Sequence, residues 1–276
     1  MLVSLAKTAF FVLLYYASQL FMSLVVQIIY IASRGGDVSE KELASFISAG
    51  SIELVLASNA ILIMVVALIS RVKNKTLSQS CDIKPIKSGY VPVIVMGIFA
   101  QFSISVILTF MMSYGLFPTK WIVSYENAPM MTTNASLIIR ILSMGIFAPL
   151  AEEIVFRGCI QKSLNESMPR WASIIITALI FAVMHGYEIQ VIYAFIFGVL
   201  ISWIYARYNS ILPTIFFHIA FNMTSVLMPN ISVYAMVMLG LGGIYIIIRG
   251  IRTVHRTTMH DIKNNDNNND KNDGEV

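Results

Sequence analysis

Charged residues are scarce in this chain of 276 residues, in which lysine, arginine, aspartate and glutamate together make up 12% and hydrophobic residues 57%. Ordinary soluble domains contain roughly 25% charged residues. The deficit excludes a soluble enzyme or a soluble nucleic-acid-binding protein as an interpretation of the whole chain. It indicates an integral membrane protein.

Cysteine is almost absent as well, with only Cys81 and Cys159 in the chain. Two distant cysteines exclude a disulfide framework and a CxxC pair of the kind found in zinc ribbons and redox sites. A cysteine or serine nucleophile is also disfavoured, because neither Cys159 nor Ser163 has a histidine at a spacing that would activate it.

Long uncharged runs are the dominant feature of the sequence. A run of about 17 residues or more can cross the roughly 30 Å hydrocarbon layer as a helix. We therefore predict an all-α fold, a polytopic bundle of about eight transmembrane helices. The predicted spans are Thr8–Ala32, Leu54–Ser70, Tyr90–Met112, Ser136–Phe156, Trp171–His185, Ile189–Ala206, Ile211–Leu227 and Val233–Ile248.

The distribution of basic residues predicts the orientation. If the N-terminus is cytoplasmic, fifteen of the 19 lysines and arginines fall on the cytoplasmic side, and only Arg34, Lys41, Lys120 and Arg140 on the other. Cytoplasmic loops carry such an excess. We predict a multi-pass protein of the cell membrane with both termini cytoplasmic. The basic residues report topology, so no nucleic-acid partner is expected.

Three segments are predicted along the chain. Residues 1–135 contain the first three spans and no motif that can be matched to a chemistry. Residues 136–250 contain the polar residues described below, and residues 251–276 form a polar tail with the sequence NNDNNNDKND at its centre. A segment of this composition cannot bury enough apolar surface to fold, so we predict that the tail is disordered and cytoplasmic.

Ionisable residues inside a membrane span are functional candidates, because burying them in lipid costs several kcal/mol. Glu53 and Arg140 lie near span ends, where snorkelling toward the interface explains them. The fourth span carries Glu152, Glu153 and Arg157. Glu153 and Arg157 share a helix face at i,i+4 and are expected to neutralise each other as an ion pair, whereas Glu152 points elsewhere and gains no such partner.

Two histidines also fall within spans, and each alone is more often a satisfied core residue than a catalyst. His185 ends the fifth span, and His218 lies in the seventh, one turn before Asn222. Glu152 and His185 are each about sixteen residues from the turn at Pro169, so both lie roughly 24 Å along antiparallel helices. His218 lies only about 12 Å from its own turn, and helix tilt must close that difference.

The motifs EExxxR, FxxxH and HxxxN follow one another on successive hydrophobic segments. In this order they resemble the CPBP family of intramembrane proteases, which includes the CaaX prenyl proteases and bacteriocin-processing relatives. The resemblance covers the part of the chain from Ser136 to Leu227. It implies an endopeptidase that hydrolyses a peptide bond of a membrane-associated peptide or protein, one that is in some relatives lipidated, near the cytoplasmic face.

Carried over to this sequence, the resemblance implies that Glu152 and His185 activate the hydrolytic water. His218 and Asn222 would stabilise the oxyanion, and Glu153 and Arg157 would complete the site. The chemistry is coherent, because amide hydrolysis needs a base for water and polarisation of the carbonyl. No cofactor is favoured. The alternative is a zinc ion held by Glu152, His185 and His218, although familiar helical zinc sites place both histidines on one helix as HExxH.

Two other functions compete with proteolysis. The acidic residues and histidines could form the proton relay of a transporter, but transporters often repeat such features in both halves, and here the polar residues are confined to one. The chain could also be a noncatalytic membrane partner, for example in bacteriocin immunity. The full set of Glu152, His185, His218 and Asn222 argues against a degenerate site.

Overall fold

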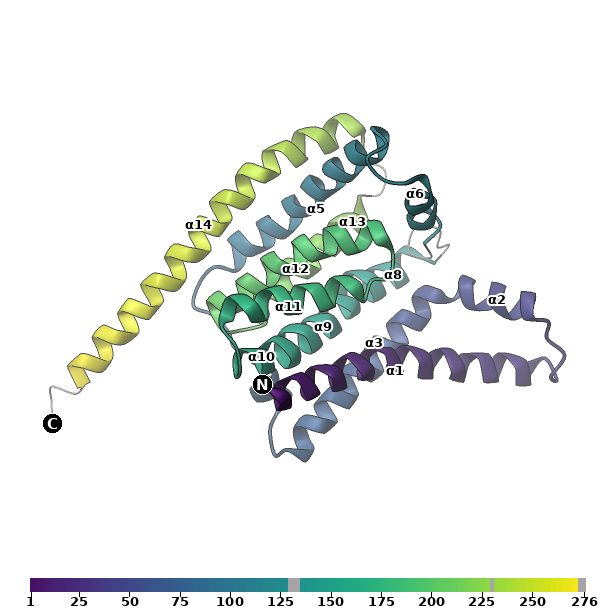
Figure 1. Ribbon diagram of the computed structural model, residues 1–276, viewed down its shortest axis with the longest axis horizontal. Helices are drawn as coiled ribbons and strands as arrows, with labels where there is room; N and C mark the ends of the chain where they lie inside the picture. Colours follow the sequence, from purple (N-terminus) through teal and green to yellow (C-terminus); the bar gives the residue numbers. More distant parts are fainter. Residues whose placement is uncertain (129–134, 229–230, 273–276) are drawn as a thin grey trace.

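The computed structural model describes residues 1–128, 135–228 and 231–272, with side chains as far as residue 259. The described residues form an all-helical bundle (Figure 1). Within these described ranges five helices are long and apolar enough to cross a membrane, and α11 and α13 are shorter apolar helices. The longer elements are α1 (Leu2–Ser33), α2 (Glu40–Ala49), α3 (Ser51–Val72), α5 (Tyr90–Ser113), α11 (Arg170–Val183), α12 (Glu188–Tyr208), α13 (Leu212–Leu227) and α14 (Val233–Asn272).

Each of the predicted spans corresponds to helix, and shorter helices lie between them. α2 begins at a capping box, in which the side chain of Ser39 accepts from the backbone N–H of Glu42 and the Glu42 carboxylate accepts from the backbone of Ser39. This reciprocal pair satisfies two of the backbone donors that a helix start leaves free. The remaining short helices are α4 (Leu77–Cys81) and α6 (Thr119–Glu126).

The fourth predicted span is a helical segment with two π-helical stretches. It consists of α8 (Leu137–Arg140), η1 (Ile141–Phe147), α9 (Ala148–Glu152), η2 (Glu153–Gln161) and α10 (Lys162–Asn165), which adjoin without a gap. Pro149 has no N–H and its ring crowds the preceding turn of an α-helix. The π-helical stretch η1 ends two residues before this proline, and such insertions occur frequently at functional sites.

The outer surface of the bundle is rich in apolar side chains, while the core lies among η2, α11, α12 and α13. Exposed side chains such as Leu13, Leu68, Ile196 and Met238 face outward. Phe156, Phe181 and Phe217 are buried. An apolar exterior around a packed interior is what a bundle that crosses lipid requires, since lipid solvates it instead of water.

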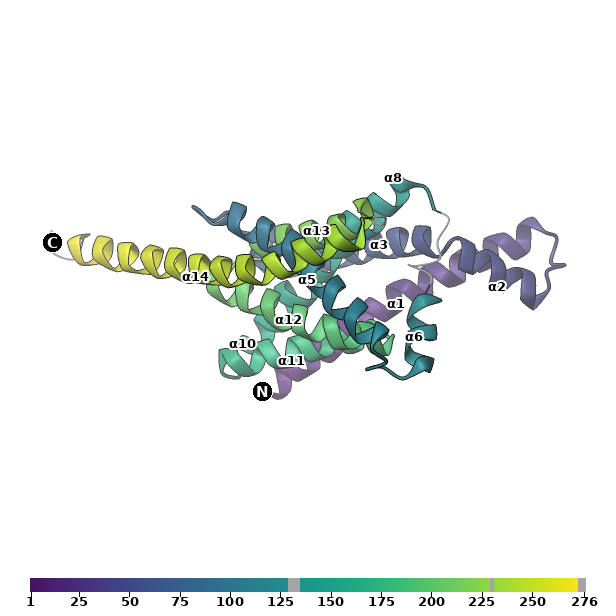
Figure 2. The ribbon, with the colours of Figure 1, turned by 90° about the horizontal axis from the view of Figure 1, so that it is seen from above.

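The C-terminal helix α14 lies beside α5 in both views (Figures 1 and 2). Small residues allow this approach, because a Cβ atom at Gly240 would lie 2.9 Å from the backbone oxygen of Phe102. The Ser103 hydroxyl donates to the Gly240 carbonyl across the contact, at 2.8 Å. Close contacts of this kind are typical of helix pairs in membranes.

The first part of the C-terminal tail is helical, whereas the sequence predicted disorder for residues 251–276. α14 continues as helix to Asn272, and Val254 and Thr258 are buried. These two residues are one turn apart and therefore share a helix face. Residues 251–259 thus extend the packed helix beyond the predicted boundary at 250.

Candidate functional site

The two adjacent glutamates occupy different environments. The side chain of Glu153 is completely buried, and Arg157 Nη1 donates to its Oε1 at 2.9 Å, which confirms the predicted ion pair. The side chain of Glu152 is 13% exposed and lines a cavity. One glutamate is therefore fixed within the protein, and the other is accessible from the cavity.

Arg157 is also fully buried, and α11 and α12 hold it in place. Its Nη2 donates to the carbonyl of Gly198 at 3.4 Å, and its guanidinium lies over the ring of Phe181 at 4.7 Å from the centroid. A buried charge is tolerated only when it is paired and hydrogen-bonded. The ion pair therefore connects η2 with two neighbouring helices and supports the position of Glu153.

His218 on α13 lies between the two glutamates. Its Nδ1 is 2.8 Å from Glu153 Oε1, and its Nε2 is 3.7 Å from Glu152 Oε2. Since a carboxylate only accepts hydrogen bonds, Nδ1 carries the proton and donates to Glu153. The position of His218 shows that tertiary packing does close the difference in depth calculated for straight helices.

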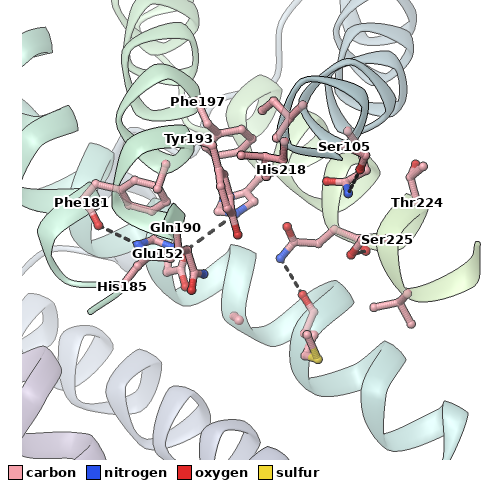
Figure 3. A pocket seen from close by; sticks show the side chains of 18 of the residues that line it. Ser105, Glu152, Phe181, His185, Gln190, Tyr193, Phe197, His218, Thr224 and Ser225 are labelled. Carbon is pink, nitrogen blue, oxygen red and sulfur yellow. Dashed lines mark hydrogen bonds and ion pairs between the residues drawn. The ribbon is translucent and has the colours of Figure 1, made fainter. Parts of the chain in front are cut away.

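His185 enters the same cavity from the end of α11. That helix ends at Val183, so His185 lies in the following turn and not in the predicted helix. Gly186 follows with a φ of +82°, a conformation that glycine adopts without strain. The His185 Nδ1–H donates to the Phe181 carbonyl at 2.8 Å, which leaves Nε2 available to the cavity (Figure 3).

Asn222 lines the cavity one turn beyond His218. Its Nδ2 donates to the Met144 carbonyl at 2.8 Å, which links α13 to η1. An amide nitrogen has two N–H donors, so this bond leaves one donor for another acceptor. Asn222 is therefore both a structural link and a potential hydrogen-bond donor to a bound group.

The cavity that contains these side chains measures about 620 Å³ (Figure 3). This is within the size range of about 300–1,000 Å³ for ligand pockets. Helices from the first predicted segment contribute to its wall, which the sequence did not predict. The lining residues that the sequence analysis did not identify include Tyr15, Gln19, Gln101, Arg140, Gln190 and Tyr193.

Arg140 was assigned to snorkelling at a span end, but it lines this cavity. Arg140, Met144, Ala148 and Glu152 recur every four residues, and all four are cavity residues. On an ideal α-helix three such steps would drift by about 120°, so the π-helical stretch η1 helps to keep these positions on one face, and the sequence alone does not place Arg140 at the cavity. The uncharged tyrosines and glutamines carry no signal in the sequence either.

The zinc alternative requires a donor set that converges on one point. Zinc ligands lie about 2.0–2.2 Å from the metal. Among the residues that the structure describes, no three His, Cys, Asp or Glu side chains form a group able to hold a metal ion. Glu152, His185 and His218 do not fit zinc in this arrangement, and we assign no step of a reaction to a metal.

Together these features define a helical membrane protein with a buried carboxylate–guanidinium–histidine cluster beside a cavity. Residues 134–224 match the sequence model of the type II CAAX prenyl endopeptidase Rce1-like family. This match confirms the predicted family resemblance, and it covers all six residues to which the resemblance assigned a role. No curated protein and no solved structure matches the chain significantly.

Proposed function

We propose that this protein is an intramembrane endopeptidase in which Glu152 activates water to hydrolyse a peptide bond. The observation that carries the proposal is the separation of the two glutamates. Glu153 is buried and paired with Arg157, whereas Glu152 faces the cavity next to His218. A general base must reach its substrate, and only Glu152 of this pair does so.

His185 and His218 would have different roles in the hydrolysis. Both have Nδ1–H committed to an acceptor, Phe181 for His185 and Glu153 for His218. In its neutral form His185 can therefore accept from water at Nε2 and orient it toward the scissile carbonyl. His218 donates from Nε2 to the oxyanion when its ring is protonated, with Glu153 as the counter-ion.

Charge balance supports a protonated His218 during the reaction. Two carboxylates and one guanidinium leave a single negative charge in the cluster of Glu152, Glu153 and Arg157. A proton on His218 balances it, and a charge in a low-dielectric site is most stable beside an opposite one. Asn222 adds a neutral donor, and each donor to an oxyanion contributes about 10²–10³ in turnover.

The membrane arrangement is part of the proposal. We infer that all eight predicted segments cross the bilayer, the short helices α11 and α13 included, and that both termini are cytoplasmic. Short helices surrounding a water-accessible cavity need not cover the full hydrocarbon thickness, because the cavity itself solvates their ends. The substrate would be a membrane-associated peptide or protein tail.

The decisive experiment measures cleavage of labelled CAAX-ended peptides, prenylated and unprenylated, by the purified full-length chain. Glu152→Gln keeps the size of the side chain and removes the base, so turnover should fall by a factor of about 10²–10⁴. Glu166→Gln is the matched control, because Glu166 is an exposed residue at the end of the same segment, where it pairs with Lys7 on the surface. Near-normal cleavage by a folded Glu152→Gln variant would exclude the proposed role.

The same assay tests whether a metal takes part. We expect activity to survive exhaustive chelation, and Asn222→Ala to lower turnover more than substrate binding, because its donor acts on the oxyanion. Stoichiometric zinc in active protein, with activity lost on chelation and restored by zinc, would instead establish the metal mechanism.

A further inference from the structure

Arg140 is a charged group that lines the cavity. Its half-buried side chain makes no ion pair or hydrogen bond with any residue that the structure describes, and its Nε is buried without an acceptor. A buried donor left unsatisfied destabilises a protein, more so when it is charged. Arg157, the other arginine of this helical segment, also has a buried Nε without an acceptor, but its charge is paired with Glu153.

Arg140 lies on the same helical segment as Glu152 and lines the same cavity. The two residues lie at opposite ends of the four-residue repeat that lines the cavity and are twelve positions apart. At 1.5 Å per residue this corresponds to about 18 Å along the helix, and less where π-helical turns hold more residues. Of the described residues that line the cavity, Arg140 is the only lysine or arginine.

We propose that Arg140 is the subsite for the C-terminal carboxylate of the peptide substrate, an inference that rests on the proposed function. A guanidinium binds a carboxylate through two parallel hydrogen bonds and so fixes its position as well as its charge. An extended peptide spans about 3.3–3.6 Å per residue. A carboxylate at Arg140 therefore places the bond at Glu152 no more than about five residues from the C-terminus.

A lipid phosphate is the other anion available in a membrane. An arginine that binds lipid headgroups snorkels outward along the surface of its helix. Arg140 instead shares the cavity with Glu152, His185 and His218. The geometry thus favours an anion that enters the catalytic cavity, which a peptide terminus does and a bilayer phosphate does not.

The test compares one labelled CAAX-ended peptide in two forms, with a free C-terminal carboxylate and with a C-terminal amide. A hydrogen bond to a charged group corresponds to a factor of about 10–100 in affinity. We expect the wild-type chain to prefer the free acid by this factor in kcat/KM. Arg140→Gln should reduce the preference to near unity by slowing only the free acid, and Arg140→Lys should retain part of it.

Arg34→Gln is the matched control, since Arg34 is an exposed arginine outside the cavity and should leave the preference unchanged. Equal use of both peptides by the wild type would overturn the subsite. So would an equal loss for both peptides in a folded Arg140→Gln variant, or a preference lost only when anionic lipid is removed.

Binding separates this inference from the proposed function. The affinity of both peptides for the Glu152→Gln variant is measured by fluorescence anisotropy, which requires no cleavage. A preference for the free acid that depends on Arg140 in this variant supports the subsite even if the wild type proves inactive. Cleavage that depends on Glu152 but shows no such preference in rate or binding refutes the subsite alone.

Discussion

At the scale of single residues, the two glutamates are distinguished by their partners and not by their chemistry. Glu153 accepts from both Arg157 and His218, while Glu152 faces the cavity. The sequence predicted the first pair, because i,i+4 spacing is a local property of a helix. The sequence could not predict the hydrogen bond between His218 and Glu153. These residues are 65 positions apart, and their contact depends on how α13 packs against η2.

The different roles predict different consequences of the same substitution. Glu153→Gln removes the charge that neutralises a fully buried Arg157, and breaking a buried pair costs about 3–5 kcal/mol. We expect a markedly lower melting temperature in detergent for Glu153→Gln. Glu152→Gln should melt close to the wild type, because the bond from Arg157 goes to Glu153 and the side chain of Glu152 faces the cavity.

Melting curves followed by tryptophan fluorescence provide the measurement, with Glu166→Gln as the surface control. If Glu153→Gln and Glu152→Gln have the same melting temperature, the proposed division between a structural and a catalytic glutamate is wrong.

At the scale of helices, the hydrophobic runs predicted the positions of the helices well, and five of these helices are long and apolar enough to cross a bilayer in the described part of the chain. The π-helical stretches were not predictable in the same way, since they depend on the backbone around Pro149 and on packing against other helices. The same limit applies to the end of α11, where Gly186 stops the helix before His185.

A close contact between α5 and α13 lies next to His218. At Gly97 on α5, a Cβ atom would lie 2.3 Å from the carbonyl oxygen of Phe217, the residue before His218. Gly97→Ala must therefore displace α13, and overpacking of this kind costs about 1–3 kcal/mol. We expect lower melting temperature and lower peptide cleavage together.

Gly242 on α14 is the matched control, because a Cβ atom there would meet nothing within 4 Å. Alanine is a better helix former than glycine by about 1 kcal/mol, so Gly242→Ala should preserve or raise stability. Full activity of Gly97→Ala would show that α13 tolerates the shift.

The loop helix α4 is held to the bundle by Asp82. Its carboxylate pairs with Lys84 at 2.9 Å and Lys162 at 3.0 Å and accepts from the Tyr205 hydroxyl at 3.0 Å. Partial burial acts to raise the pKa of the Asp82 carboxyl, but the hydrogen bonds from Lys84, Lys162 and Tyr205 outweigh it. The pKa therefore lies below the ordinary value of 3.8.

This shift predicts how stability depends on pH. Because the folded state lowers the pKa of Asp82, its contribution is complete above pH 3.8 and is lost as the pH falls below that value through the folded-state pKa. We expect the melting temperature of the wild type to drop more steeply in this range than that of Asp82→Asn. Asp37→Asn, at an exposed loop position, should follow the wild type; a wild-type slope shared by Asp82→Asn would contradict the assignment.

At the scale of the whole molecule, the ends of the helices separate into two groups. The N-terminus, α10 and the end of α14 lie toward one end of the bundle, and α2, α6 and α8 toward the other (Figures 1 and 2). The first group carries more lysines and arginines than the second, in agreement with the pattern that predicts a cytoplasmic location. Figure 1 places α8, which ends at Arg140, at the opposite end.

Thiol labelling of single cysteines tests this orientation. In a background in which Cys81 and Cys159 are replaced by alanine, we expect Lys75→Cys to react with a membrane-impermeant thiol reagent only after the membrane is opened. Asp37→Cys, in the loop between α1 and α2, should react in intact cells. Labelling of Lys75→Cys in intact cells, with protection of Asp37→Cys, would reverse the topology.

The orientation also constrains how a substrate enters. With α10 on the cytoplasmic side, Arg140 lies farther from the cytoplasm than Glu152 along the same helical segment. A cytoplasmic peptide tail would then enter with its C-terminus leading, pass Glu152 and place its carboxylate at Arg140. In the reversed topology Arg140 would lie at the cytoplasmic entrance, and a tail bound there by its terminus would have to fold back to reach Glu152. Thiol labelling and the preference for the free acid are therefore two independent tests of the same arrangement, in which Arg140 lies beyond Glu152 as seen from the cytoplasm.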